Sequence, residues 1–84
     1  MAFPRTVAGA AKRGWTVVYV PRREDLSWAG ICNWIYSNVT GQFVADYRYK
    51  GDGDVAFERS EDASMVIMSL NGTALPDYRK LRSR

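Results

Sequence analysis

The side chains in this sequence that could do chemistry are a group of carboxylates and one thiol. Asp46, Asp52 and Asp54 lie close together in the middle of the chain, and Cys32 is the only cysteine. Asp52-Gly53-Asp54 could suggest a cation site, but it lacks the spacing and the closing glutamate of an EF-hand loop. A lone cysteine forms neither an internal disulfide nor a cysteine metal cluster. We therefore expect no metal site and interpret the Asp-Gly-Asp segment as part of a turn.

Histidine is absent from the chain. Histidine is the commonest general base and the commonest metal ligand, so its absence argues against most acyl-transfer and zinc chemistry. An acylphosphatase-like enzyme is also disfavoured, because no Gly-rich anion-binding loop stands with a matched Arg and Asn. We expect no enzyme, no cofactor and no small-molecule substrate.

The positive charge of the chain is concentrated at its C-terminal end. The formal net charge is +3, from 12 basic and 9 acidic residues, and four of the basic residues are Arg79, Lys80, Arg82 and Arg84. The rest of the chain is close to neutral. A basic tail can contact phosphate groups, and it can equally be a solvated terminus.

The hydrophobic pattern argues against a membrane-spanning helix. The apolar segments are shorter than the roughly 20 residues that span a bilayer, and the N-terminal residues have no apolar core of a signal peptide. From this and the single unpaired cysteine we expect a cytoplasmic protein.

The elements that must position these residues follow the order β, α, β, β, α and β. Residues 1–13 show no periodicity and are interpreted as a flexible arm before a domain over 14–84. Residues 15–20 are rich in β-formers and end at Pro21, which predicts a strand. A helix begins near Asp25 or Ser27, because Trp28, Ile31, Ile35 and Val39 recur at helical spacing.

The second half of the predicted domain begins with a hairpin. Residues 42–49 alternate between two faces, the turn signal 50–54 follows, and 55–58 is a short strand. Ser60 is expected to cap a helix that ends at Asn71-Gly72. Leu75 or residues 78–82 are the candidates for a last strand. We predict an α+β, ferredoxin-like βαββαβ fold with an antiparallel sheet and both helices packed on one face.

Over residues 15–82 the sequence resembles an RNA recognition motif (RRM) domain. The residues at the family's spacing are Phe57, Asp62, Ala63, Val66, Leu70, Asn71, Gly72 and Leu75, with Val66 where the family usually has Ala. The third-strand motif of the family has the frame of residues 50–57, where Lys50, Gly51, Gly53, Val55 and Phe57 match. The two aromatic residues that stack on bases in that motif are replaced by Asp52 and Asp54. On the first strand the register is open between Thr16 and the set Trp15, Val17 and Tyr19.

The resemblance implies a non-enzymatic module that binds single-stranded RNA through the sheet face and the tail. The candidate nucleic-acid-binding residues are Lys50, Arg48, Tyr19, Tyr47, Tyr49, Arg79, Lys80, Arg82 and Arg84. The replaced aromatics weaken this hypothesis, because base stacking contributes roughly 1–3 kcal/mol per base and a carboxylate repels phosphate.

The alternative is a protein-interaction module. Its candidate residues are Asp52 and Asp54 on the sheet face, or Trp28 and Trp34, of which one is expected to be exposed. Small ferredoxin-like chains also occur as phage-encoded inhibitors of host or defence proteins, which is an analogy of fold only. An exposed last strand could also pair with its copy in a homodimer.

Overall fold

Three helices and four strands follow one another along residues 3–76 and 78, the part of the chain that the computed structural model describes. Their bounds, in chain order, are α1 Val7–Lys12, β1 Thr16–Val20, α2 Trp28–Asn38, β2 Phe43–Tyr47, β3 Gly53–Phe57, α3 Ser60–Leu70 and β4 Thr73–Ala74. The fold is therefore α+β, as predicted.

The sheet is antiparallel, with the strand order β2-β3-β1-β4. β2 and β3 form the predicted hairpin, and the turn between them places Lys50 at φ 56° and Gly51 at φ 96°. Two consecutive residues with positive φ are typical of the type I′ turn, whose twist matches that of the flanking strands. β2 and β4 are the two edges of the sheet.

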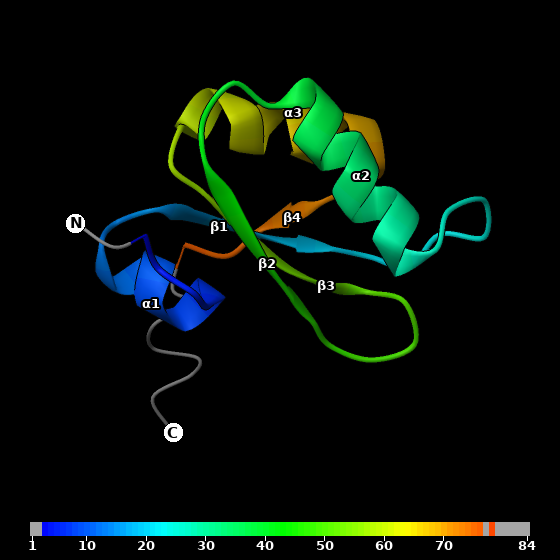
Figure 1. Ribbon diagram of the computed structural model, residues 1–84. Coiled ribbons are helices and arrows are strands. Elements are labelled where there is room, and N and C mark those ends of the chain that lie inside the picture. The colour runs from blue at the N-terminus through cyan, green and yellow to red at the C-terminus, as the bar shows by residue number, and fades with distance from the viewer. Residues whose placement is uncertain (1–2, 77, 79–84) are drawn as a thin grey trace.

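The helices α2 and α3 lie on one face of the sheet (Figure 1), and the main hydrophobic core lies between them and that face. Ile31 and Ile35 from α2 and Val66 from α3 are fully buried against Val55 and Phe57 of β3. The alternation of the strands and the helical spacing of the apolar residues explain this layer. The prediction that these two helices pack on one face of the sheet is confirmed.

α1 covers part of the other face, where the sequence predicts only a flexible arm. Thr6 begins the helix, because its Oγ1 accepts a hydrogen bond from the Gly9 N–H at 3.0 Å. Val7 and Ala10 are fully buried, and with Ala11 they form a second apolar cluster. The arm prediction is wrong for Val7–Lys12, because small residues spaced i, i+3 and i+4 can bury a short helix on a sheet.

The last strand also differs from its prediction. β4 is Thr73–Ala74, next to β1, and Leu75 follows it with its N–H bonded to the Val17 carbonyl at 2.9 Å. Of the predicted segment 78–82 only Tyr78 lies within the described residues, and it is buried outside any strand. The other predicted residues of that segment lie outside the described part of the chain.

Candidate functional site

Asp54 lies on the sheet face that α1 partly covers, and Asp52 is hydrogen-bonded to Tyr19 of the same face. Asp54 is opposite Tyr19 of β1 and opposite Asp46 of β2. Asp46 accepts a hydrogen bond from the Val7 N–H at 2.8 Å, so it binds the first turn of α1. A carboxylate at this place is stabilised by the helix dipole. This part of the face is therefore used to hold α1.

Asp54 is buried, with 4% of its surface exposed, and Arg48 neutralises it. The Arg48 Nε donates to Asp54 Oδ2 at 3.0 Å, and Arg48 Nη2 forms an ion pair with Oδ1 at 2.9 Å. The guanidinium carbon of Arg48 lies 4.7 Å from the centre of the Tyr19 ring, a cation–π contact. The Arg48 side chain thus binds the buried Asp54 carboxylate and also covers one face of the Tyr19 ring.

Tyr19 also holds the second carboxylate, since its hydroxyl donates to Asp52 Oδ2 at 2.5 Å. This hydrogen bond is the main reason that the pKa of Tyr19 is raised and that the pKa of Asp52 is lowered. The hydrogen bond to Asp54 likewise raises the pKa of Arg48. Tyr19, Arg48, Asp52 and Asp54 therefore form one network in which each charged or polar group has a partner inside the protein.

Within the described part of the chain, the predicted nucleic-acid-binding residues are not brought together on one surface. Tyr19 and Arg48 lie in the network just described, but the Tyr47 ring lies 6.0 Å from that of Trp28, on the α2 side of the sheet. Tyr49 is exposed in the hairpin, with the Lys50 ammonium 5.3 Å from the centre of its ring. The basic residues Arg79, Lys80, Arg82 and Arg84 lie outside the described residues.

Both Trp28 and Trp34 are partly buried against the main core, so the prediction that one of them is exposed is wrong. A helix face wide enough for both rings explains this, because the aromatic rings flank the fully buried Ile31 and Ile35. The exposed aromatic residue of α2 is Tyr36, with 77% of its surface accessible.

Residues 26–45 contain no charged residue, although a quarter of the chain is charged. This stretch includes all of α2, the loop after it and the first three residues of β2. We call its solvent-facing part the neutral surface. An open groove crosses it and is lined by Tyr36, Val39, Gly41, Gln42 and Phe43.

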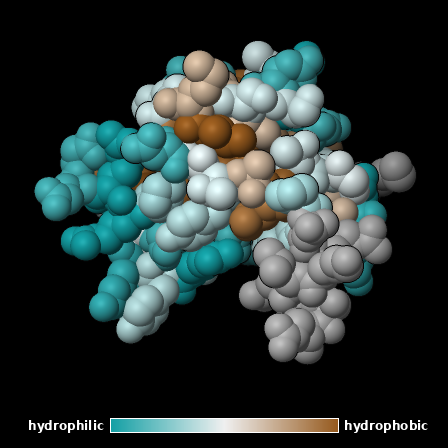
Figure 2. All heavy atoms as spheres, turned by 180° about the vertical axis from the view of Figure 1, so that it is seen from behind, coloured by the Kyte–Doolittle hydropathy of each residue, from teal (hydrophilic) through white to brown (hydrophobic). Residues whose placement is uncertain are grey.

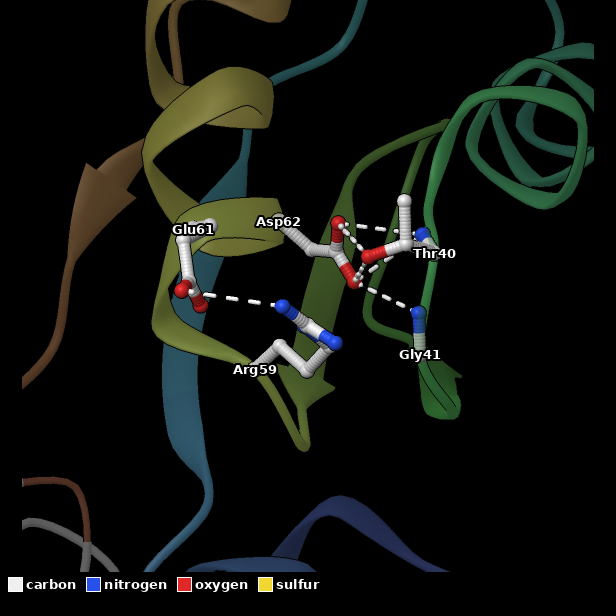
Figure 3. A network of polar contacts seen from close by, with 5 residues as sticks. All are labelled: Thr40, Gly41, Arg59, Glu61 and Asp62. Carbon is white, nitrogen blue, oxygen red and sulfur yellow. Dashed lines mark hydrogen bonds and ion pairs between the residues drawn. The ribbon is translucent and has the colours of Figure 1, made fainter.

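Asp62 of α3 fixes the loop that forms one wall of this groove. The carboxylate, 4% exposed, accepts hydrogen bonds from the Gly41 N–H at 2.9 Å and from the Thr40 N–H at 3.1 Å, as Figure 3 shows. Burial raises the pKa of Asp62, but these hydrogen bonds outweigh it and the pKa is lowered overall. The Arg59 and Glu61 side chains form an ion pair at 3.7 Å nearby, and the Arg59 side chain lies beside Gly41, which lines the groove.

The outer edge of β2 borders the neutral surface. On the β3 side, the Gln42 carbonyl accepts from the Glu58 N–H and the Arg48 N–H donates to the Asp52 carbonyl. In an antiparallel ladder every second residue bonds to the same neighbouring strand. The N–H and C=O groups of Phe43, Ala45 and Tyr47 therefore point away from β3, towards the outer edge. Within the described residues no hydrogen bond reaches these outward groups. Edge strands are commonly protected by charged side chains. Here the only charged residue of β2 is Asp46, which is bound to α1.

A second apolar area lies on the opposite side of the molecule. Figure 2 shows a band of hydrophobic residues there between hydrophilic ones. This side includes α3 and the β4 edge, and Met68 of α3 is 84% exposed. The β4 edge offers few backbone hydrogen-bonding groups to a partner strand, because β4 is only two residues long.

Two parts of this site were not predicted from the sequence. The uncharged stretch 26–45 is visible in the sequence as a run without Asp, Glu, Lys or Arg. The cover that α1 gives to the sheet face could have been suspected from Thr6 as a cap and from the spacing of Val7, Ala10 and Ala11.

Comparisons with models of known protein families, with curated proteins and with solved structures find no match to this chain. None of the helices in the described residues has the length and apolar character needed to cross a membrane. Within the same residues no cluster of three Cys, Asp or Glu side chains is placed to hold a metal ion.

Proposed function

We propose that this chain is a non-enzymatic protein-interaction module that binds its partner through the neutral surface. The observation that carries the proposal is the complete absence of charge over residues 26–45, next to an open groove and an unpaired strand edge. The centres of protein–protein interfaces are depleted of charged residues and enriched in aromatic ones, whereas their rims are polar. Tyr36 supplies an exposed aromatic side chain at the groove, and Arg59 supplies a charged side chain beside Gly41.

We further propose that the fold is ferredoxin-like, with the strand topology of the RRM domain. The strand order β2-β3-β1-β4 and the shared side of α2 and α3 support this. In such a fold the face opposite the two helices is the usual nucleic-acid surface. Here α1 is an additional element on that face.

Binding of single-stranded RNA through the sheet face is supported less well. The positions expected to stack on bases hold Asp52 and Asp54, and the Tyr19 ring already contacts Arg48. The nearby Val17 and Ala56 are buried beside α1. A base would have to displace these internal contacts, and its phosphate would approach carboxylates.

The proposal is tested by placing the photo-crosslinking residue benzoylphenylalanine at position 36 in cells that naturally express the chain. The matched control carries it at position 68, since Met68 is at least as exposed as Tyr36 but lies on α3. We expect a discrete protein adduct from position 36 and none from position 68. Adducts of equal yield from both positions, or no protein adduct from position 36, would overturn the proposal.

A further inference from the structure

We propose that the β2 edge binds a second copy of this chain, so that two sheets join into one across antiparallel β2 strands. This inference rests on the proposed function and names the partner of the same surface. The edge has the three features that such pairing needs: outward N–H and C=O groups at alternate residues, apolar side chains beside them, and no free charge.

The sequence of β2 is complementary to itself around Ala45. If the two-fold axis passes beside Ala45, each Ala45 lies opposite the partner's Ala45, and each Phe43 lies opposite the partner's Tyr47. These are the outward-facing residues, so each pair exchanges two backbone hydrogen bonds, about six in all. Any other register leaves some of these outward groups unpaired.

The side chains agree with this register. Phe43 and Ala45 pack toward the main core, and Tyr47 lies beside Trp28, so all three are on the α2 side of the sheet. The register therefore forms two aromatic cross-strand pairs, with the small alanines at the axis, and aromatic pairs are favourable across strands. Tyr36 and its groove lie on the same side, where a second copy would bury them.

The charges on the other face do not oppose this arrangement. Each Asp46 lies opposite the partner's Val44, and each Arg48 lies opposite the partner's Gln42, so no two like charges are directly opposed. Asp46 remains bound to the Val7 N–H of its own α1. A strand from a different protein would need side chains that suit Phe43, Ala45 and Tyr47 at the opposing positions. A second copy of this chain supplies them by symmetry.

The first test is sedimentation equilibrium of the full chain from micromolar to near-millimolar concentration, together with amide hydrogen exchange by NMR. We expect a monomer–dimer equilibrium in which the Phe43, Ala45 and Tyr47 amides become protected as the concentration rises. The outward amide of Ala74 on β4 should continue to exchange rapidly. A chain that stays monomeric, or a dimer in which the three β2 amides exchange rapidly at all concentrations, would overturn the inference.

The matched variants are Ala45→Pro and Ala74→Pro. Each removes an N–H that points away from the sheet, on opposite edges, so both should fold. Ala45→Pro should raise the dissociation constant of the dimer roughly tenfold or more, because two hydrogen bonds at the axis are lost. Ala74→Pro should leave it unchanged, and equal effects of the two variants would refute the assignment to β2.

The two proposals fail in different ways. If the chain is monomeric but position 36 crosslinks to another protein, this inference fails and the proposed function stands. If position 36 gives no protein adduct and the chain is monomeric, both fail. An adduct from position 36 with the mass of two copies of this chain supports both.

Discussion

Replacing Asp62 with alanine is expected to lower the free energy of unfolding by about 2–3 kcal/mol at pH 7. The carboxylate is 4% exposed and accepts backbone hydrogen bonds from Thr40 and Gly41. Removing it leaves these two N–H groups without their acceptor, and hydrogen bonds to a charged group each contribute about 1.5–3 kcal/mol. We expect less than the sum, because Thr40 is exposed and water can replace part of the interaction.

The loss of folding stability caused by Asp62→Ala should be larger near neutral pH than in acid. The pKa of Asp62 is lowered in the folded protein, so its carboxylate stabilises the fold above the pKa of the unfolded chain, about 3.9. This contribution is lost as the pH falls through the lower pKa of the folded state. The difference between wild type and Asp62→Ala should therefore be largest near neutral pH and shrink towards pH 2.

Urea unfolding, followed by tryptophan fluorescence at pH 7 and near pH 2, measures both effects. Glu61→Ala is the matched control, because Glu61 is the neighbouring carboxylate but its side chain is 72% exposed in a long ion pair. The control should change stability by less than about 0.5 kcal/mol. A deficit of Asp62→Ala that is the same at both pH values would refute the reasoning, since a packing defect would not depend on the ionisation of this group.

Two further substitutions test the sheet that carries the site. Arg48→Ala should destabilise the fold by about 1–3 kcal/mol, because Asp54 would stay buried without its cation, although the half-exposed position of Arg48 lets water compensate in part. A urea midpoint equal to that of wild type would contradict this. Gly53→Ala should cost about 1–3 kcal/mol, because its Cβ would come within 2.4 Å of the Trp28 ring and 2.5 Å of the Asp46 carbonyl oxygen. Thermal unfolding checks it, and an unchanged Tm would mean that β3 can shift away from α2.

The parts of the fold that were predicted correctly have a strong local signal. The spacing of Ile31 and Ile35 identifies α2, and Ser27 caps it as one of the two expected candidates, with its Oγ bonded to the Gly30 N–H. Asn71 ends α3 in the left-handed conformation, as expected for a helix stop. The hairpin followed from alternation and from the turn residues Lys50-Gly51.

The parts that were missed depend on tertiary contacts. α1 has six residues, too few to be stable alone, and it exists because the sheet buries its small side chains. Ser60 was expected to cap α3, but Arg59 takes the N-cap position without a side-chain bond. The Asp62 carboxylate instead binds the distant loop at Thr40 and Gly41, a partner that no local pattern reveals.

The candidate site was predicted only in part. In the RRM resemblance Asp52 and Asp54 stand where aromatic residues stack on bases, and this correspondence stays a prediction. The partners of these two carboxylates were not predicted, because Tyr19 lies in β1 and Arg48 directly follows β2, and they meet the carboxylates only in the folded sheet. Neither Trp28 nor Trp34 is exposed as one of them was expected to be, since aromatic residues at helical spacing are as suited to a core as to a surface. Their part in binding a partner stays a prediction.

The most direct test of the central claim compares crosslinks from the neutral surface with crosslinks from the hairpin next to the charged sheet face. Benzoylphenylalanine would replace Tyr36 in one variant and Tyr49, which is 69% exposed, in another. The adducts formed in cells would be divided by their sensitivity to protease and to ribonuclease. We predict protein adducts from position 36 and no ribonuclease-sensitive adduct from position 49. Ribonuclease-sensitive adducts from position 49, with no protein adduct from position 36, would contradict the account.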